Sequence, residues 1–179
     1  KPVRHHALHT HILNQLKQTN KKTSEAEPVK QLEILNNTAE HFPLSILLAE
    51  DDRTNQDVEI RILNKLGYYP DLAQNGREVL EMSEAKNYDV IFMDVQMPEV
   101  DGREVTRIIR KRKGAQPVIA AITANAMQGD KEECLSAGMD EYLAKPISFK
   151  KIASLIDTCA SIVKGLNPVD RNEAIKLIE

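Results

Sequence analysis

Five short apolar runs between residues 45 and 145, separated by segments with a helical repeat, constrain the fold of this chain more than any other feature. Each run ends near Gly, Pro, Asn or Asp, as strands bounded by turns do. Nearly continuous apolar strands that alternate with helices are typical of a parallel sheet with both faces covered. The pattern therefore predicts a doubly wound α/β domain, whose strands are the runs SILLA, YYPDLA, YDVIFM, PVIAAIT and EYLAK.

The segments between the runs carry apolar residues at helical spacing. Between the first two runs, the predicted buried face of the helix is Val58, Ile62, Leu63 and Leu66, and Gly67 is predicted to end that helix. The same spacing recurs before the fourth run and after the fifth, at Val105, Ile108 and Ile109 and at Ile152, Leu155, Ile156 and Cys159.

Polar residues follow the predicted strands at the points where the strands end. Because ligands of such sheets bind outside the carboxyl ends of the strands, we expect these residues to meet at one edge. They are Glu50, Asp51 and Asp52 after the first run, Asp94 after the third, Thr123 at the end of the fourth and Lys145 at the end of the fifth.

Carboxylates gathered at one edge repel one another by on the order of several kcal/mol unless a cation lies among them. An oxygen-only ligand set, without Cys or His, favours Mg²⁺ over zinc. An Asp carboxylate held beside Mg²⁺ and a lysine can attack phosphorus and form an aspartyl phosphate. Thr123 would then supply a hydroxyl donor, and Lys145 an ammonium, for the phosphoryl oxygens.

Four stretches that carry these residues, ILLAEDD, FMDVQMPEVDG, AITANA and YLAKP, resemble the successive signatures of the two-component receiver domain. LLAEDDRTNQ and MDVQMPEVDG are most similar to the receivers of hybrid sensor histidine kinases. The resemblance covers residues 44–164 and implies a flavodoxin-like fold, with five parallel strands in the order 2-1-3-4-5.

The resemblance also implies a role for each residue at the edge. These roles are the phospho-acceptor at Asp94; Mg²⁺ ligation by Glu50, Asp51, Asp94 and the backbone carbonyl of Gln96; phosphoryl binding by Lys145; switching by Thr123 and Tyr142; and a cis peptide at Lys145-Pro146.

One residue departs from the resemblance, because Asp52 stands where that subgroup often has Asn. An extra acid at the edge would tighten or distort Mg²⁺ binding. The alternative is a solvated acid at a helix start, where the positive end of the helix dipole favours it. In that region Thr54 and Asp57 also fit a capping box.

The function that the resemblance implies is a phosphorelay receiver, which accepts a phosphoryl group from a phosphohistidine of a histidine kinase or a histidine phosphotransfer protein. The alternative is a receiver fold that works only by docking. An aspartate-nucleophile phosphatase is disfavoured because AEDDRT lacks the Asp-x-Asp that follows the first strand of such enzymes. No Gly-x-Gly nucleotide-binding segment occurs, so the chain is expected to be an acceptor without a kinase core, taken from a longer hybrid kinase.

Composition restricts the partners and the compartment. With 24 Lys and Arg against 27 Asp and Glu, the chain lacks the basic field that nucleic acid binding requires. Cys134 and Cys159 do not form a disulfide framework, and the apolar runs are too short to cross a membrane. We therefore expect no nucleic acid partner, no direct membrane contact and a cytoplasmic location.

The first 43 residues lie outside the predicted receiver. Residues 1–19 are expected to be the last helix of an upstream receiver-like domain, because KPVRHHALHTHIL resembles KPISFKKIASLID, which begins the last helix of this receiver. Residues 20–43 are expected to be a linker, and residues 165–179 a C-terminal helical extension. The N-terminal helix has an apolar stripe, for which we expect association with the receiver or with a second copy; its residues are Val3, Ala7, Leu8, Ile12 and Leu16.

Overall fold

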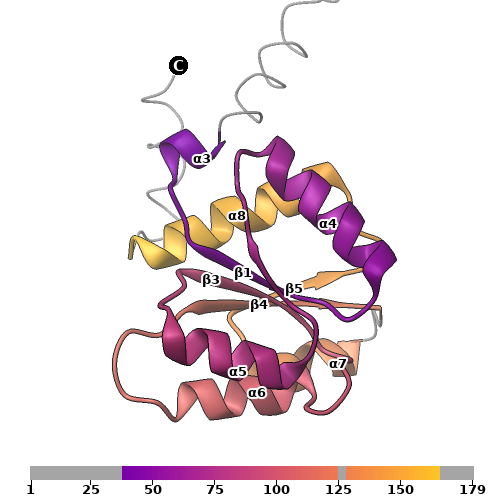
Figure 1. Cartoon of the computed structure of the whole chain (residues 1–179), viewed down its shortest axis with the longest axis vertical. Coiled ribbons are helices and arrows are strands. Elements are labelled where there is room, and N and C mark those ends of the chain that lie inside the picture. The colour runs from indigo at the N-terminus through magenta and orange to yellow at the C-terminus, as the bar shows by residue number, and fades with distance from the viewer. Residues whose placement is uncertain (1–37, 125–127, 166–179) are drawn as a thin grey trace, which may run out of the picture. The chain divides into compact units, whose positions relative to one another are not determined.

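The computed structural model describes residues 38–124 and 128–165, which contain a five-stranded parallel sheet in the order β2-β1-β3-β4-β5 (Figure 1). The predicted fold class and strand order are confirmed. The elements are α3 (Thr38–His41), β1 (Ile46–Ala49), α4 (Arg53–Lys65), β2 (Asp71–Ala73), α5 (Gly76–Ala85), β3 (Val90–Asp94), α6 (Gly102–Arg110), β4 (Val118–Thr123), α7 (Gln128–Ser136), β5 (Glu141–Ala144) and α8 (Phe149–Val163).

Helices cover both faces of the sheet. Figure 1 shows α4 and α8 on one face, and α5, α6 and α7 on the other. Successive residues of a strand point to opposite faces, so Leu48 packs with Leu63 and Ile156, whereas Leu47 packs with Val79 and Val105. Each face therefore has its own apolar core, and the three central strands, β1, β3 and β4, are buried along their length.

The central strand β3 carries the acid Asp94 to the edge of the sheet. All five of its residues are buried, and it pairs with β1 on one side and with β4 on the other. A backbone held by ladders on both sides is rigid, so the carboxylate at its end has a fixed position.

The inner face of α4 differs from the prediction. Val58 is 44% exposed, whereas Gln56 and Glu59 are buried together with Leu63. Successive residues are about 100° apart on a helix, so the face that contains Gln56, Glu59 and Leu63 turns Val58 outwards. The assignment of Val58 to the buried face was wrong, and the assignments of Leu63 and Leu66 are confirmed.

The start of α4 is also capped differently. Asp52 is its N-cap, and its Oδ1 accepts a hydrogen bond of 2.9 Å from the backbone N–H of Asn55. The capping box predicted at Thr54 and Asp57 is therefore wrong, because the helix begins at Arg53. At the other end, Gly67 follows the helix with a φ of 88°, as expected of a glycine stop.

Part of the predicted linker is folded. Residues 38–41 form α3, in which the Ala39 N–H donates to the Leu66 carbonyl at 3.1 Å. Phe42 follows, and its ring lies 4.2 Å from the Lys164 ammonium. The predicted N-terminal helix, the rest of the linker and the C-terminal extension fall outside the described residues. No helix in the described part of the chain is long and apolar enough to cross a membrane.

Candidate active site

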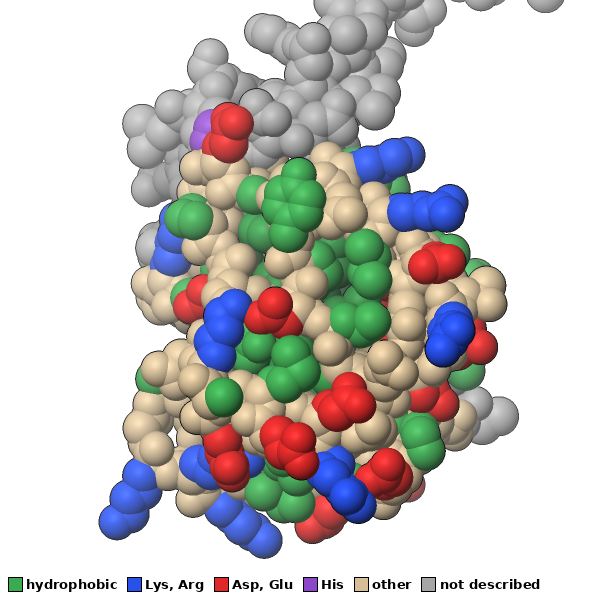
Figure 2. Space-filling view, viewed as in Figure 1, with side chains coloured by type: hydrophobic (Ala, Val, Ile, Leu, Met, Phe, Trp, Pro, Cys, Tyr) green, Lys and Arg blue, Asp and Glu red, His purple; other side chains and the backbone are tan. Residues whose placement is uncertain are grey.

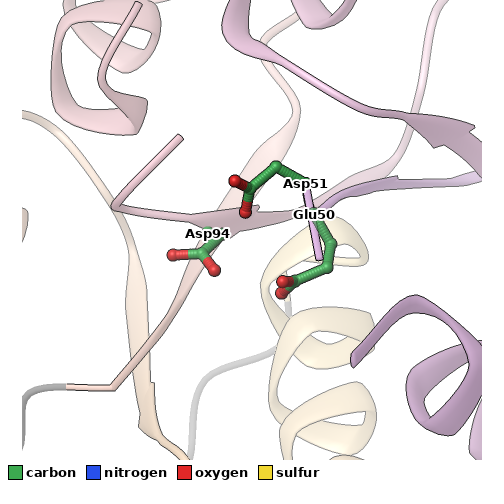
Figure 3. A group of neighbouring side chains, drawn as sticks. All are labelled: Glu50, Asp51 and Asp94. Atoms are coloured by element: carbon green, nitrogen blue, oxygen red, sulfur yellow. The ribbon is translucent and has the colours of Figure 1, made fainter. Parts of the chain in front are cut away.

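Three of the four acids predicted to meet at the carboxyl edge do so, and the fourth, Asp52, caps α4 instead. Glu50 and Asp51 directly follow β1, Asp94 ends β3, and one ligand atom from each lies within 4.8 Å of the others (Figure 3). Glu50 and Asp94 are buried, whereas Asp51 is exposed. Within the described residues, the Asp51 carboxylate accepts no hydrogen bond and forms no ion pair, so its oxygens are available to a cation.

Lys145 joins two of these acids from the end of β5. Its Nζ lies 2.6 Å from Glu50 Oε2 and 2.6 Å from Asp94 Oδ2. Burial opposes the charge of this ammonium, but the hydrogen bonds that it donates to Asp94 and Glu50 outweigh burial and raise the pKa of Lys145. The ammonium therefore partly offsets the repulsion among the carboxylates.

The start of α4 holds Glu50 in place. Glu50 Oε1 accepts a hydrogen bond of 2.9 Å from the Asn55 side chain, and the Gln56 side chain donates to the Glu50 carbonyl at 2.6 Å. Burial raises the pKa of Glu50, although the bonds from Lys145 and Asn55 oppose that shift. Asn55 and Gln56 were missed in the sequence, where their only signal is their position in the first turn after the acids.

The loop after β3 folds back against the acceptor strand. Asp94 Oδ1 accepts a hydrogen bond of 2.9 Å from the Gln96 N–H, and the Gly102 N–H donates to the Val95 carbonyl at 3.0 Å. A Cβ at Gly102 would lie 2.3 Å from the Asp94 carbonyl oxygen, so only glycine permits this close approach. The ligand role of the Gln96 carbonyl stays a prediction.

The remaining predicted residues lie on β4 and β5. Thr123 is buried at the end of β4, and its carbonyl accepts a hydrogen bond of 2.8 Å from the Lys145 N–H. Tyr142 is half-buried against the core on the α5 side, and burial raises the pKa of its phenol. The Lys145-Pro146 peptide is cis, as the resemblance implied. The switch roles of Thr123 and Tyr142 stay predictions.

A further acid, Glu59, was not identified from the sequence. It is 1% exposed on the inner face of α4, and its Oε1 has no hydrogen-bond partner. Burial, and after it the negative charge of Glu50, raises the pKa of Glu59 to about 8. Its signal was its helical spacing from Gln56 and Leu63, which the apparent apolar stripe through Val58 obscured.

This arrangement has the parts needed for phosphoryl chemistry. Three carboxylates around one small space supply the hard oxygen ligands that Mg²⁺ prefers, so the site fits that ion. A carboxylate such as that of Asp94 can attack phosphorus, and a cation such as Lys145, 2.6 Å from it, can offset negative charge that develops on phosphoryl oxygens.

Comparison with known proteins agrees with this chemistry. Residues 46–157 match the family model of the response regulator receiver domain. The chain is 37% identical over 141 residues to hybrid signal transduction histidine kinase K of Dictyostelium discoideum. This alignment covers 72% of this chain and 12% of that kinase. The chain therefore spans a small part of the length of this relative.

Two solved structures are similar in fold and in sequence. The receiver domain of sensor histidine kinase PA1611 from Pseudomonas aeruginosa, which has a magnesium ion coordinated in its active site cleft, is 40% identical with a TM-score of 0.62. The receiver domain of Ssk1 from Saccharomyces cerevisiae, in complex with the histidine phosphotransfer protein Ypd1, is 30% identical with a TM-score of 0.58. The alignments cover 66% of this chain in each case, and 98% and 87% of those chains.

Proposed function

The chain belongs to the response regulator receiver domain family, with relatives in hybrid histidine kinases, and from this premise we propose that Asp94 accepts a phosphoryl group from a phosphohistidine. The observation that carries the proposal is the contact of Lys145 Nζ with the Asp94 carboxylate inside a cluster of three acids. A phospho-acceptor needs a nucleophile, a metal site and a fixed cation within one small space, and these residues supply all three.

In the proposed transfer, an Asp94 carboxylate oxygen forms a bond to phosphorus while the bond between phosphorus and the donor imidazole nitrogen breaks. The imidazole leaves with the electron pair of that bond. In this scheme Lys145 stabilises the negative charge on the phosphoryl oxygens, and the hydroxyl of Thr123, a buried residue at the end of β4, donates to the same group.

Glu50, Asp51, Asp94 and the carbonyl of Gln96 are the residues proposed to hold Mg²⁺. When bound, the ion would neutralise these carboxylates and attract the phosphoryl oxygens. Support comes from the magnesium ion in the similar PA1611 receiver and from the exposed Asp51 carboxylate, which has no partner among the described residues.

The proposed partner is a phosphohistidine protein that docks beside the acceptor, over the first half of α4. Val58 is 44% exposed on that helix, and Figure 2 shows apolar side chains along α4 and the segment that leads to β2. The Ssk1 receiver, which is similar in fold, forms a complex with a histidine phosphotransfer protein. We further propose that the whole protein is a hybrid histidine kinase with this receiver in the cytoplasm.

Phosphorylation with acetyl phosphate and Mg²⁺, followed by intact mass measurement, tests the proposal. The wild type should gain one phosphate, and Asp94→Asn none, because the amide keeps the shape but is not a nucleophile. Lys145→Ala should be labelled poorly. Asp57→Asn, which changes an exposed acid on α4, is the matched control and should be labelled like the wild type. Full labelling of Asp94→Asn would place the acceptor elsewhere.

A further inference from the structure

Lys145 binds two of the carboxylates that a divalent cation would bind. Its Nζ lies 2.6 Å from both Glu50 Oε2 and Asp94 Oδ2, and both residues belong to the acid cluster proposed to hold Mg²⁺. A divalent ion and an ammonium a few ångströms apart repel each other by on the order of several kcal/mol. Metal binding therefore requires the ammonium to leave at least one of these carboxylates.

A displaced Lys145 ammonium needs another acceptor, because its side chain is 16% exposed and a buried charge without a hydrogen bond is costly. Among the described residues, Glu59 Oε1 is the one buried side-chain oxygen or nitrogen without a hydrogen-bond partner. The charged groups that act on Glu59 are Glu50, Lys145 and Asp94, the same three that meet at the edge.

The geometry of α4 places Glu59 next to this network. Asn55 and Gln56, in the first turn of the helix, both donate hydrogen bonds to Glu50. Glu59 follows on the same inner face, one turn further from the edge, because residues three and four apart on a helix lie above one another. Glu59 is therefore buried one turn below the residues that hold Glu50, close enough for the charges of Glu50 and Lys145 to act on its carboxyl.

We propose that Glu59 is a second acceptor for the Lys145 ammonium, which moves from Glu50 to Glu59 Oε1 when Mg²⁺ binds and leaves Glu59 for the phosphoryl oxygens when a phosphoryl group arrives. Glu59 is a positioning residue in this scheme, since it touches neither the metal nor the phosphoryl group. The inference rests on the proposed function, because it assigns Mg²⁺ to the acid cluster. It gives a purpose to a buried, unpaired carboxyl that packing alone does not require.

Calorimetric titration with Mg²⁺ of the wild type, Glu59→Leu and Glu59→Gln tests the proposal. Leucine removes the acceptor, so Mg²⁺ should bind about tenfold more weakly, which corresponds to the loss of one hydrogen bond to a charged group. Glutamine keeps an acceptor oxygen and should bind Mg²⁺ within about twofold of the wild type. Equal affinity in all three proteins, or equal loss in both variants, would overturn the proposal.

A second readout follows Lys145 itself. The ¹³Cε resonance of Lys145, assigned by its absence in Lys145→Ala, should shift on addition of Mg²⁺ in the wild type and in Glu59→Gln. In Glu59→Leu the shift should be much smaller. Failure of the two proposals can be told apart: a wild type that does not bind Mg²⁺ contradicts the proposed function, whereas normal Mg²⁺ binding by Glu59→Leu contradicts this inference alone.

Discussion

Helices α4 and α8 cover the same face of the sheet, but they bury side chains of different kinds. The inner face of α8 is apolar, apart from the thiol of Cys159, and includes Ile152, Leu155 and Ile156. The inner face of α4 contains Gln56 and Glu59 before it reaches Leu63. The two helices therefore do different work: α8 contributes to the core along its length, whereas the first half of α4 supports the acid cluster.

This difference has a cost in stability. A buried glutamate with an unpaired oxygen is unfavourable, and the same volume filled by an aliphatic side chain would stabilise the fold. Functional sites commonly retain such unfavourable groups, because the arrangement that serves the chemistry differs from the one that maximises stability. The comparison predicts that substitutions in α8 and α4 change stability in opposite directions.

The largest effect is expected from Ile156→Ala in α8. Ile156 is fully buried, and removing its side chain from a packed core should lower the free energy of unfolding by about 3 kcal/mol. Urea denaturation measures this loss. Mg²⁺ affinity should stay within about twofold of the wild type, because α8 contributes none of the clustered carboxylates. A large change in Mg²⁺ affinity would contradict the conclusion that α8 contributes to the core but not to the acid cluster.

The next effect concerns Glu59 and depends on pH. Its pKa is about 8 in the folded protein against an ordinary value of 4.5, so the folded state keeps a proton that the unfolded chain releases. The contribution of Glu59 to stability is therefore lost progressively as pH rises from about 4.5 to about 8. In metal-free protein, Glu59→Leu should remove this loss and be more stable than the wild type by roughly 2 kcal/mol at pH 9.

Urea denaturation at pH 5 and pH 9, with a chelator present, checks this prediction. The exposed Glu81 of α5 provides the matched control, because Glu81→Leu should change stability equally at both pH values. If Glu59→Leu follows the pH dependence of the wild type, then Glu59 is already ionised in the folded protein and the comparison with α8 fails.

A smaller effect is expected at Asp52, the N-cap of α4. Asp52→Ala removes the acceptor for the Asn55 N–H and should cost about 1 kcal/mol, whereas Asp52→Asn keeps an acceptor oxygen and should cost much less. Neither variant should change Mg²⁺ affinity by more than about twofold, because Asp52 lies outside the cluster of carboxylates. Strong loss of Mg²⁺ binding in both variants would instead make Asp52 part of the metal site.

The sequence predicted the sheet and the residues at its edge because both depend on strong local patterns. Apolar runs identify the strands, and a parallel sheet brings their carboxyl ends together whatever the details of packing. The acid cluster and the contacts of Lys145 with Asp94 and Glu50 follow from that topology.

The inner face of α4 could not be predicted in the same way. Spacing shows which residues share a helix face, but the orientation of that face depends on the groups packed against it. Near the edge those groups are polar, so Glu59 is buried and Val58 is not. The short helix α3 was missed for a related reason, because four residues form a helix only through contacts with distant parts of the chain, such as the bond from Ala39 to Leu66.

The smallest effect on stability, and the sharpest test of the two helices, is expected from a pair of exposed residues. Val58 on α4 is 44% exposed and Ile162 on α8 is 42% exposed, so replacing either by Ser should change the free energy of unfolding by less than about 0.5 kcal/mol. Their effects on phosphotransfer should differ. Val58 lies near the acceptor edge, in the first half of α4, whereas Ile162 lies at the C-terminal end of α8.

Transfer from a phosphorylated histidine phosphotransfer protein should therefore slow by about fivefold or more in Val58→Ser, because an apolar contact of the docked complex is lost. Ile162→Ser should transfer like the wild type, and acetyl phosphate should label both variants equally, because that small donor does not dock. Rates measured by the loss of label from the donor distinguish the cases. Equal slowing in both variants would show that docking is not centred on α4, and slow labelling of Val58→Ser by acetyl phosphate would assign the defect to the acid cluster.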